Sequence, residues 1–210
     1  MSRAFNSFVR LQEGVYRFSR GGSSAASDGP HVTLVGGVHG NERIGVEVLD
    51  ALRLAFLHAA PLSTANGLFP LVTRGSLTLV YGNPQAQRIG KRGSDPHADL
   101  NRCFPRDLLT NSVSTSDARS YEHRRARDLA PLFAASDLLV DLHSTNKPSP
   151  PFVRLSGHVS VPPRLWEVSG RLPTRMLLLD PKHLIGDGSV ALTDEFVGIH
   201  GGMGVCYESG

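Results

Sequence analysis

Short apolar runs alternate with longer amphipathic stretches along the chain. Residues 31–35 are mostly apolar and β-branched and lie between glycine-containing turns, which predicts a buried strand. In the segment 43–57, apolar residues recur near helical spacing and predict an amphipathic helix that packs on the sheet. Its expected inward side chains are Ile44, Val48, Leu49, Leu52 and Phe56. Further strands are predicted at 76–80, 137–142, 152–155, 176–179 and 205–207.

One long polar segment interrupts this alternation. Residues 85–111 are rich in Gly, Pro, Asp and Arg and predict an irregular loop, and loops of this length usually carry function. Ser116 and Asp117 then offer N-caps for a helix that runs to about Ala134. A solvated helix face is expected for its charged residues Glu122, Arg124, Arg125, Arg127 and Asp128. Strands that alternate with helices predict an α/β fold whose sheet is at least partly parallel.

The composition is that of an ordinary globular protein. Hydrophobic residues make up 40% and charged residues 20% of the 210 residues, which fits one domain spanning 1–210. Twenty-two Lys and Arg against nineteen Asp and Glu leave a net charge of only +3, and 7% of residues are aromatic, so no nucleic-acid partner is expected. No apolar run approaches the roughly 20 residues of a membrane span.

The N-terminus lacks the apolar core of a secretory signal, so a cytoplasmic protein is expected. Two cysteines, Cys103 and Cys206, are too few for a disulfide framework. We expect both of them to be small buried residues.

Polar side chains follow four of the predicted strands at the point where each strand ends. His39 and Glu42 follow the first strand, Asn83 follows the second, His143 follows the third and Glu208 follows the last. Because ligands bind at the carboxyl ends of strands in open α/β sheets, we expect these side chains to meet at one edge of the sheet.

Two imidazoles and one carboxylate form the ligand set of many hydrolytic zinc sites, which keep a fourth position open for water. His39 and Glu42 lie three residues apart in a glycine-flanked strand-to-helix turn, and His143 completes the set from a distant strand. A His-x-x-Glu pair alone is a weak signal, and its position after a buried strand gives it weight. Glu208 is then the candidate general base. Asp141 shares a strand face with His143 and is a candidate partner for its imidazole.

Several motifs together resemble the succinylglutamate desuccinylase/aspartoacylase family. They run in the family's order from residue 35 to the end of the chain. The motifs are VGGVHGNE at 35–42, GNP at 82–84 with RIGKR at 88–92, DLNR at 99–102, YExRRA at 121–126, DLH at 141–143 and ESG at 208–210. The resemblance implies a zinc carboxypeptidase-like α/β fold, with a mixed, largely parallel sheet flanked by helices on both faces.

The resemblance also implies roles for individual residues. It makes His39, Glu42 and His143 the ligands of one Zn²⁺ per chain, and it makes Glu208 the catalytic residue that activates water. Arg92 matches the arginine that stabilises the developing oxyanion. Asn101 and Arg102 match the pair that holds the substrate carboxylate, which suits the planar fork of a guanidinium.

Two features depart from the family pattern. The stretch 186–202 contains no arginine, whereas aspartoacylases carry one there for the second carboxylate of aspartate, so another acyl-amino acid or small amide fits as well. The chain also ends two residues after Glu208, without the smaller β-rich domain of the family. We therefore expect Glu208 to be weakly held at the end of its strand.

The leading hypothesis is a zinc-dependent hydrolase that cleaves the amide bond of a small N-acyl amino acid. A zinc carboxypeptidase or peptide amidase would use the same ligands on a peptide, and a zinc-binding module without turnover is a third hypothesis. Cobalt or manganese could occupy the same three ligands, although their types favour zinc. The sequence does not indicate the oligomeric state.

Overall fold

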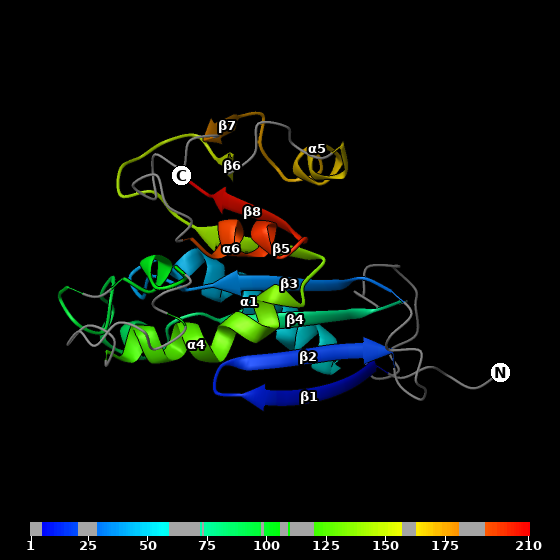
Figure 1. The fold of residues 1–210 in the computed structure, drawn as a ribbon, viewed down its shortest axis with the longest axis horizontal. Coiled ribbons are helices and arrows are strands. Elements are labelled where there is room, and N and C mark those ends of the chain that lie inside the picture. The colour runs from blue at the N-terminus through cyan, green and yellow to red at the C-terminus, as the bar shows by residue number, and fades with distance from the viewer. Residues whose placement is uncertain are drawn as a thin grey trace.

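The computed structural model describes residues 6–20, 29–58, 72, 74–97, 99–105, 109, 120–156, 163–180 and 192–210. The strands of the described residues form a single sheet in the order β1-β2-β4-β3-β5-β8-β6-β7 (Figure 1). Their bounds are β1 Asn6–Gln12, β2 Val15–Arg20, β3 His31–Gly36, β4 Ser76–Tyr81, β5 Leu138–His143, β6 Phe152–Ser156, β7 Leu177–Asp180 and β8 Met203–Glu208. The helices are α1 Arg43–His58, α2 Pro84–Ile89, the short 3₁₀ helix η2 Leu100–Arg102, α4 Tyr121–Ala134, α5 Pro163–Ser169 and α6 Thr193–Ile199.

The sheet is mixed, with a parallel centre. Strands β4, β3, β5 and β8 run parallel to one another, β2 pairs antiparallel with β4, and β6 pairs antiparallel with β8. The predicted α/β class is therefore confirmed. The β1–β2 hairpin was not predicted, because Val15 and Phe18 are its only fully buried residues among those described and they face opposite sides of the sheet.

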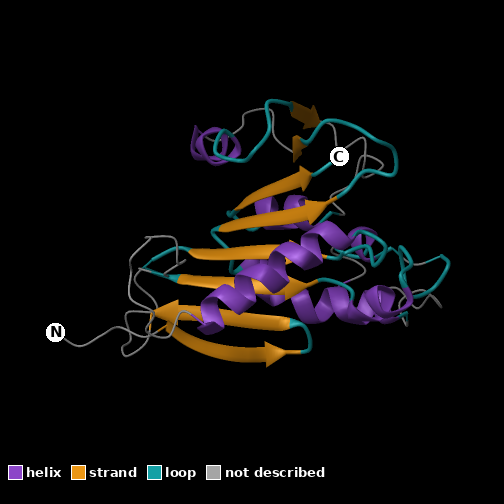
Figure 2. Ribbon diagram, turned by 180° about the vertical axis from the view of Figure 1, so that it is seen from behind, coloured by secondary structure: helices purple, strands orange, loops and turns teal. Residues whose placement is uncertain are grey.

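Helices cover both faces of this sheet (Figures 1 and 2). On one face, α4 and α6 pack over a cluster that includes Val35, Val80 and Leu139. The neighbouring residues Leu34, Leu79 and Val140 point to the other face, where α1 and α5 pack. This alternation follows from the two-residue period of a strand, and burial on both faces explains why these strands read as continuous apolar runs.

Helix α1 has the predicted position but a rotated inward face. Leu49 and Phe56 are buried as expected, whereas Ile44 and Val48 are 41% and 38% exposed, so that part of the prediction is wrong. Gly45 takes the inward position of the first turn, where a Cβ atom would lie 2.7 Å from the carbonyl oxygen of Leu142. The helix thus approaches the sheet so closely at this end that no side chain fits between them.

The predicted loop 85–111 is partly helical. Asn83 caps α2, accepting a hydrogen bond of 2.9 Å from Ala86 N, and Pro84 occupies the first helical turn, where no N–H is needed. A 3₁₀ turn, η2, follows Asp99. The described residues between α2 and η2 are irregular as predicted, so the polarity of this segment reflects both a loop and the caps of two short helices.

Helix α4 begins at Tyr121 with Ser120 as its N-cap, while Ser116 and Asp117 lie outside the described residues. Its charged residues do not all form the solvated face that was predicted, because Glu122 is 0% and Arg125 only 4% exposed. Both side chains reach loops of the neighbouring elements, a contact that helical periodicity alone cannot reveal.

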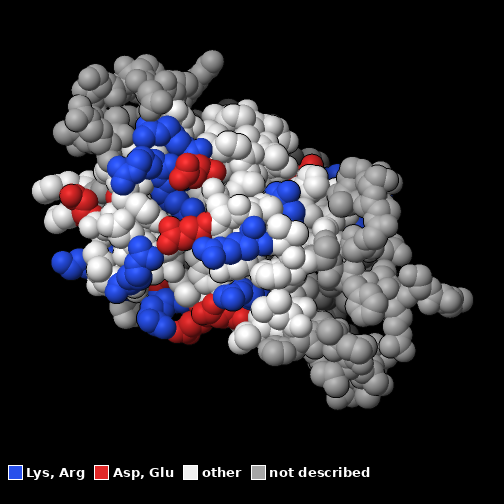
Figure 3. Space-filling model, turned by 90° about the horizontal axis from the view of Figure 1, so that it is seen from below, with Lys and Arg blue, Asp and Glu red and all other residues white. Residues whose placement is uncertain are grey.

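The described surface is mixed in charge. Lys and Arg side chains lie interspersed with Asp and Glu side chains over the face shown in Figure 3. None of the helices in the described ranges combines the length and the apolar character required to cross a lipid bilayer.

The packing between α4 and the sheet can be tested at Phe133, which is fully buried and stacks on Phe104 with ring centroids 5.5 Å apart. Phe133→Ala should lower the free energy of unfolding by about 3–5 kcal/mol, measured by urea denaturation. Leu54→Ala removes a side chain that is 55% exposed and should change it by less than about 0.5 kcal/mol. Similar losses in both variants would contradict the assignment of this cluster as the core.

Candidate metal centre and pocket

The turn between β3 and α1 carries His39 and Glu42. Gly37 has a φ of +66°, a backbone conformation that favours glycine. A Cβ atom on Gly40 would lie 2.1 Å from the carbonyl carbon of Ala86, so this turn packs directly on α2. The glycines predicted to permit a tight turn are therefore required by the backbone, and they hold the two polar side chains at the carboxyl end of β3.

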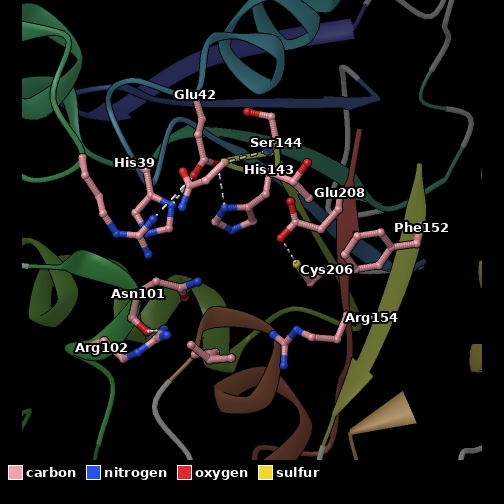
Figure 4. A pocket seen from close by; sticks show the side chains of 14 residues that line it. His39, Glu42, Asn101, Arg102, His143, Ser144, Phe152, Arg154, Cys206 and Glu208 are labelled. Atoms are coloured by element: carbon pink, nitrogen blue, oxygen red, sulfur yellow. Dashed lines mark hydrogen bonds and ion pairs between the residues drawn. The ribbon is translucent and has the colours of Figure 1, made fainter. Parts of the chain in front are cut away.

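His39, Glu42 and His143 meet at this edge of the sheet (Figure 4). Nδ1 of His39 lies 2.7 Å from Oε1 of Glu42, and Nδ1 of His143 lies 2.9 Å from Oε2 of the same carboxylate. One nitrogen or oxygen of each residue lies within 4.8 Å of the others, and all three residues are buried. Three buried atoms of this type at this separation could hold a divalent metal ion.

The second nitrogen of each imidazole faces another carboxylate. Nε2 of His39 lies 3.0 Å from Oδ1 of Asp99, and Nε2 of His143 lies 2.9 Å from Oδ2 of Asp141. Metal-binding histidines commonly have this arrangement, because a carboxylate on the outer nitrogen fixes the ring and makes the other nitrogen a better ligand. The predicted Asp141 contact is present, whereas Asp99 was recognised only as part of a motif.

These contacts determine the charge of the cluster. Burial alone would lower the pKa of His39, but the hydrogen bonds with Asp99 and Glu42 outweigh burial and raise it. Burial likewise opposes the charged form of His143, yet Asp141 and Glu42 raise its pKa well above the ordinary value. In Glu42 the hydrogen bonds from the two imidazoles overcome the effect of burial, so its pKa lies well below the usual range. An ionised Glu42 is the form that can bind a cation.

Glu208 lies beside this cluster on an interior strand. In β8 it pairs with His143 of β5 on one side and with Phe152 of β6 on the other. The expectation of a weakly held Glu208 is therefore wrong, because the sheet supports its backbone from both sides. Directly paired residues project to the same face of a sheet, so Glu208 and His143 point the same way.

The Glu208 carboxylate is only partly satisfied. Oε1 lies 3.9 Å from the Sγ atom of Cys206, and Oε2 is buried with no hydrogen-bond partner among the described residues. Burial raises the pKa of Glu208, and the negative charges of Glu42 and Asp141 add to this rise, while His143 and Arg154 oppose it. An unpartnered buried oxygen on a carboxylate of raised pKa is suited to accept a proton.

A pocket of about 250 Å³ opens over these groups. All seven residues singled out from the sequence line it: His39, Glu42, Arg92, Asn101, Arg102, His143 and Glu208. Asn101 and Arg102 lie on the side away from Glu208 (Figure 4). The structure therefore brings the predicted site residues together from four separate parts of the chain.

Arg92 and Asn101 have further contacts within this pocket. Arg92 donates from Nε and Nη2 to Oδ2 of Asp99 at 3.1 and 2.9 Å, and its Nη1 lies 3.8 Å from Oε1 of Glu42. The side-chain oxygen of Asn101 accepts a hydrogen bond of 3.0 Å from Thr193 N, which leaves its amide group as a donor.

Arg154, a buried residue of β6, also lines the pocket and was not predicted from the sequence. Its guanidinium donates to Asp194 at 2.8 Å and to Glu195 at 3.4 Å, both on α6. Burial opposes its charge, but these carboxylates raise its pKa, so it remains a cation. The one signal available in the sequence was an arginine between two apolar residues, Val153 and Leu155, of a predicted strand.

Cys103 and Cys206 are buried as predicted, and Cys206 lies in the pocket wall.

Comparisons with known proteins point to one family. A family model described as the succinylglutamate desuccinylase/aspartoacylase catalytic domain matches residues 28–157. A probable aspartoacylase from Nostoc sp. is 35% identical over 119 residues, 54% of this chain and 35% of that protein. An N-acyl-aromatic-L-amino acid amidohydrolase (carboxylate-forming) B from Danio rerio is 32% identical over 120 residues, 54% of this chain and 34% of that protein. The matches thus cover about a third of the length of these relatives.

Solved structures agree on the architecture. The succinylglutamate desuccinylase from Chromobacterium violaceum superposes with a TM-score of 0.70 at 21% identity, covering 97% of this chain and 58% of that chain. At this identity the likeness concerns the fold alone. It confirms the zinc carboxypeptidase-like fold that the motifs implied.

Metal binding by the three converging residues can be measured directly. Protein stripped with a chelator should bind one divalent metal ion per chain in a calorimetric titration, and His39→Ala or His143→Ala should abolish this binding. His97→Ala, at an exposed histidine, serves as the control and should bind as the wild type does. Unchanged binding in the His39 and His143 variants would show that the ion is held elsewhere.

Proposed function

Because this chain belongs to the succinylglutamate desuccinylase/aspartoacylase family, we propose that it is a zinc-dependent hydrolase that cleaves the amide bond of an N-acyl amino acid or a related small amide. The family model matches residues 28–157, more than half of the chain. The observation that carries the proposal is the buried His39–Glu42–His143 cluster beside Glu208, whose Oε2 has no partner among the described residues.

The donor set suits zinc. Two imidazole nitrogens and one carboxylate oxygen are ligands that Zn²⁺ takes in hydrolytic sites, and both imidazoles have a carboxylate behind them. When bound, zinc supplies Lewis acidity towards a carbonyl group and towards water. Glu42 and the two histidines would hold the ion, and Asp99 and Asp141, on the outer nitrogens, would keep the imidazoles oriented.

Glu208 is the proposed general base. Its carboxylate accepts a proton from the attacking water while the new C–O bond forms at the amide carbon. When the C–N bond breaks, the same proton passes from Glu208 to the leaving nitrogen, and the products are a carboxylic acid and an amine. The raised pKa of Glu208 suits a group that both accepts and returns a proton.

The arginines of the pocket orient the substrate. Arg102 and the amide group of Asn101 are donors for a carboxylate of the substrate, on the side of the pocket away from Glu208. Arg92 is held by Asp99, with its Nη1 near Glu42, which places positive charge beside the reacting carbonyl. In this scheme Arg92 stabilises the developing oxyanion.

The nature of the acyl and amino groups can be tested by a substrate screen. We expect the zinc-loaded protein to hydrolyse N-acyl amino acids, among them N-acetylaspartate, N-succinylglutamate and N-acetyl derivatives of aromatic amino acids, in preference to dipeptides with a free C-terminus. Product amine is measured by chromatography. Preference for the dipeptides would instead support a carboxypeptidase, and zinc binding with no hydrolysis of either class would support a binding module.

The role of Glu208 predicts a specific loss. Glu208→Gln removes the base and should lower kcat by at least about 100-fold, the lower range for a general base, while zinc content stays at the wild-type level. Glu47→Gln makes the same chemical change on α1, where the carboxylate is 59% exposed, and should leave kcat unchanged. Full activity of Glu208→Gln would exclude Glu208 as the base.

A further inference from the structure

Helix α4 directs two buried charged side chains at the loops that build the pocket. Glu122 and Arg125 belong to the motif at 121–126, for which the proposed function has no role. Arg125 donates from Nε to the carbonyl oxygen of Gly82 at 2.9 Å and from Nη2 to that of Tyr81 at 2.8 Å. These bonds tie α4 to the end of β4, directly before the Asn83 turn.

Glu122 fixes the next segment of the same loop region. Its Oε1 accepts hydrogen bonds from Nδ2 of Asn83 at 2.9 Å and from the backbone N–H of Ser94 at 2.6 Å. Its Oε2 accepts a hydrogen bond from the Ser94 hydroxyl at 2.9 Å. A fully buried carboxylate with three donors holds Ser94 through both its backbone and its side chain.

Ser94 lies two residues after Arg92, whose side chain is 45% exposed. The backbone carbonyl of Arg92 accepts a hydrogen bond of 3.3 Å from Gly40 N, next to His39. The Arg92 guanidinium then reaches Asp99, which in turn contacts His39. A continuous set of contacts therefore runs from Glu122 through Ser94 and Arg92 to the cluster of His39, Glu42 and His143.

We propose that Glu122 is a positioning residue that holds the 90–95 segment so that Arg92 faces the reacting carbonyl. This inference rests on the proposed function. Glu122 touches neither substrate nor metal in this scheme, and it acts through Ser94 and Arg92. Two carboxyl oxygens suit the task, because all three groups around Glu122 donate hydrogen bonds.

A double-mutant cycle separates positioning from a general loss of structure. Glu122→Gln places an amide N–H among these donors and should lower kcat/KM by roughly 10- to 100-fold, as for partners that orient a functional group, with zinc content unchanged. In an Arg92→Ala background the same substitution should have an effect below about 3-fold, because there is no guanidinium left to position. Asp128→Asn is the matched control on an exposed part of α4 and should leave kcat/KM unchanged.

Equal loss of kcat/KM from Glu122→Gln with and without Arg92 would overturn the proposal. Should Glu122→Gln fail to fold, Ser94→Ala decides the question in the same cycle. It removes only the hydroxyl contact, and it should give a smaller loss that again disappears in the Arg92→Ala background.

Hydrogen exchange tests the contact without any assay of turnover. The Ser94 amide donates to Glu122, so Glu122→Gln should accelerate exchange in the 90–95 segment while β4 and α4 keep their wild-type protection. Unaltered exchange in that segment would overturn the proposal. If the wild type hydrolyses no substrate, the proposed function fails, and the exchange experiment still shows whether Glu122 orders the loop.

Discussion

The arrangement of the pocket depends on the hydrogen bonds between the Glu42 carboxylate and two imidazoles. Each of its oxygens lies within hydrogen-bond distance of a different imidazole, one from its own turn and one from β5. The Ser144 N–H also donates to Oε2, at 3.1 Å, so the carboxylate joins the ends of two parallel strands. Burying the Glu42 carboxylate is tolerable because both of its oxygens have hydrogen-bond partners. Here that requirement leaves the ligand atoms already assembled around a common point.

Two further carboxylates, those of Asp99 and Asp141, connect the imidazoles to neighbouring elements. Asp99 contacts His39 and receives Arg92, while Asp141 contacts His143 and accepts a hydrogen bond from the Thr193 hydroxyl of α6. The geometry of the His39–Glu42–His143 cluster is thus linked to η2 on one side and to α6 on the other. In the proposed hydrolase, residues remote from the substrate would act on the reaction through these links.

The elements and site residues predicted from the sequence were those that depend on residues close together in the chain. Buried parallel strands appear as apolar runs, and a polar residue directly after such a run lies at the sheet edge. These strand ends, together with the motifs RIGKR at 88–92, DLNR at 99–102 and ESG at 208–210, indicated the family and seven of the residues that line the pocket. The burial of Glu122 and Arg154 was not recognised. Glu122 and Arg154 look like solvated residues in sequence, and only partners 28 and 40 positions away reveal that they are buried.

The separation of the ligands along the chain has a consequence for maturation. His143 lies 101 positions from Glu42, and the two meet only because β3 and β5 pair side by side. An isolated β3–α1 unit would offer two ligands, too few for tight capture of an ion. An ion held by all three residues would therefore bind only once β3 and β5 have paired, and its binding free energy would add to the stability of that pairing.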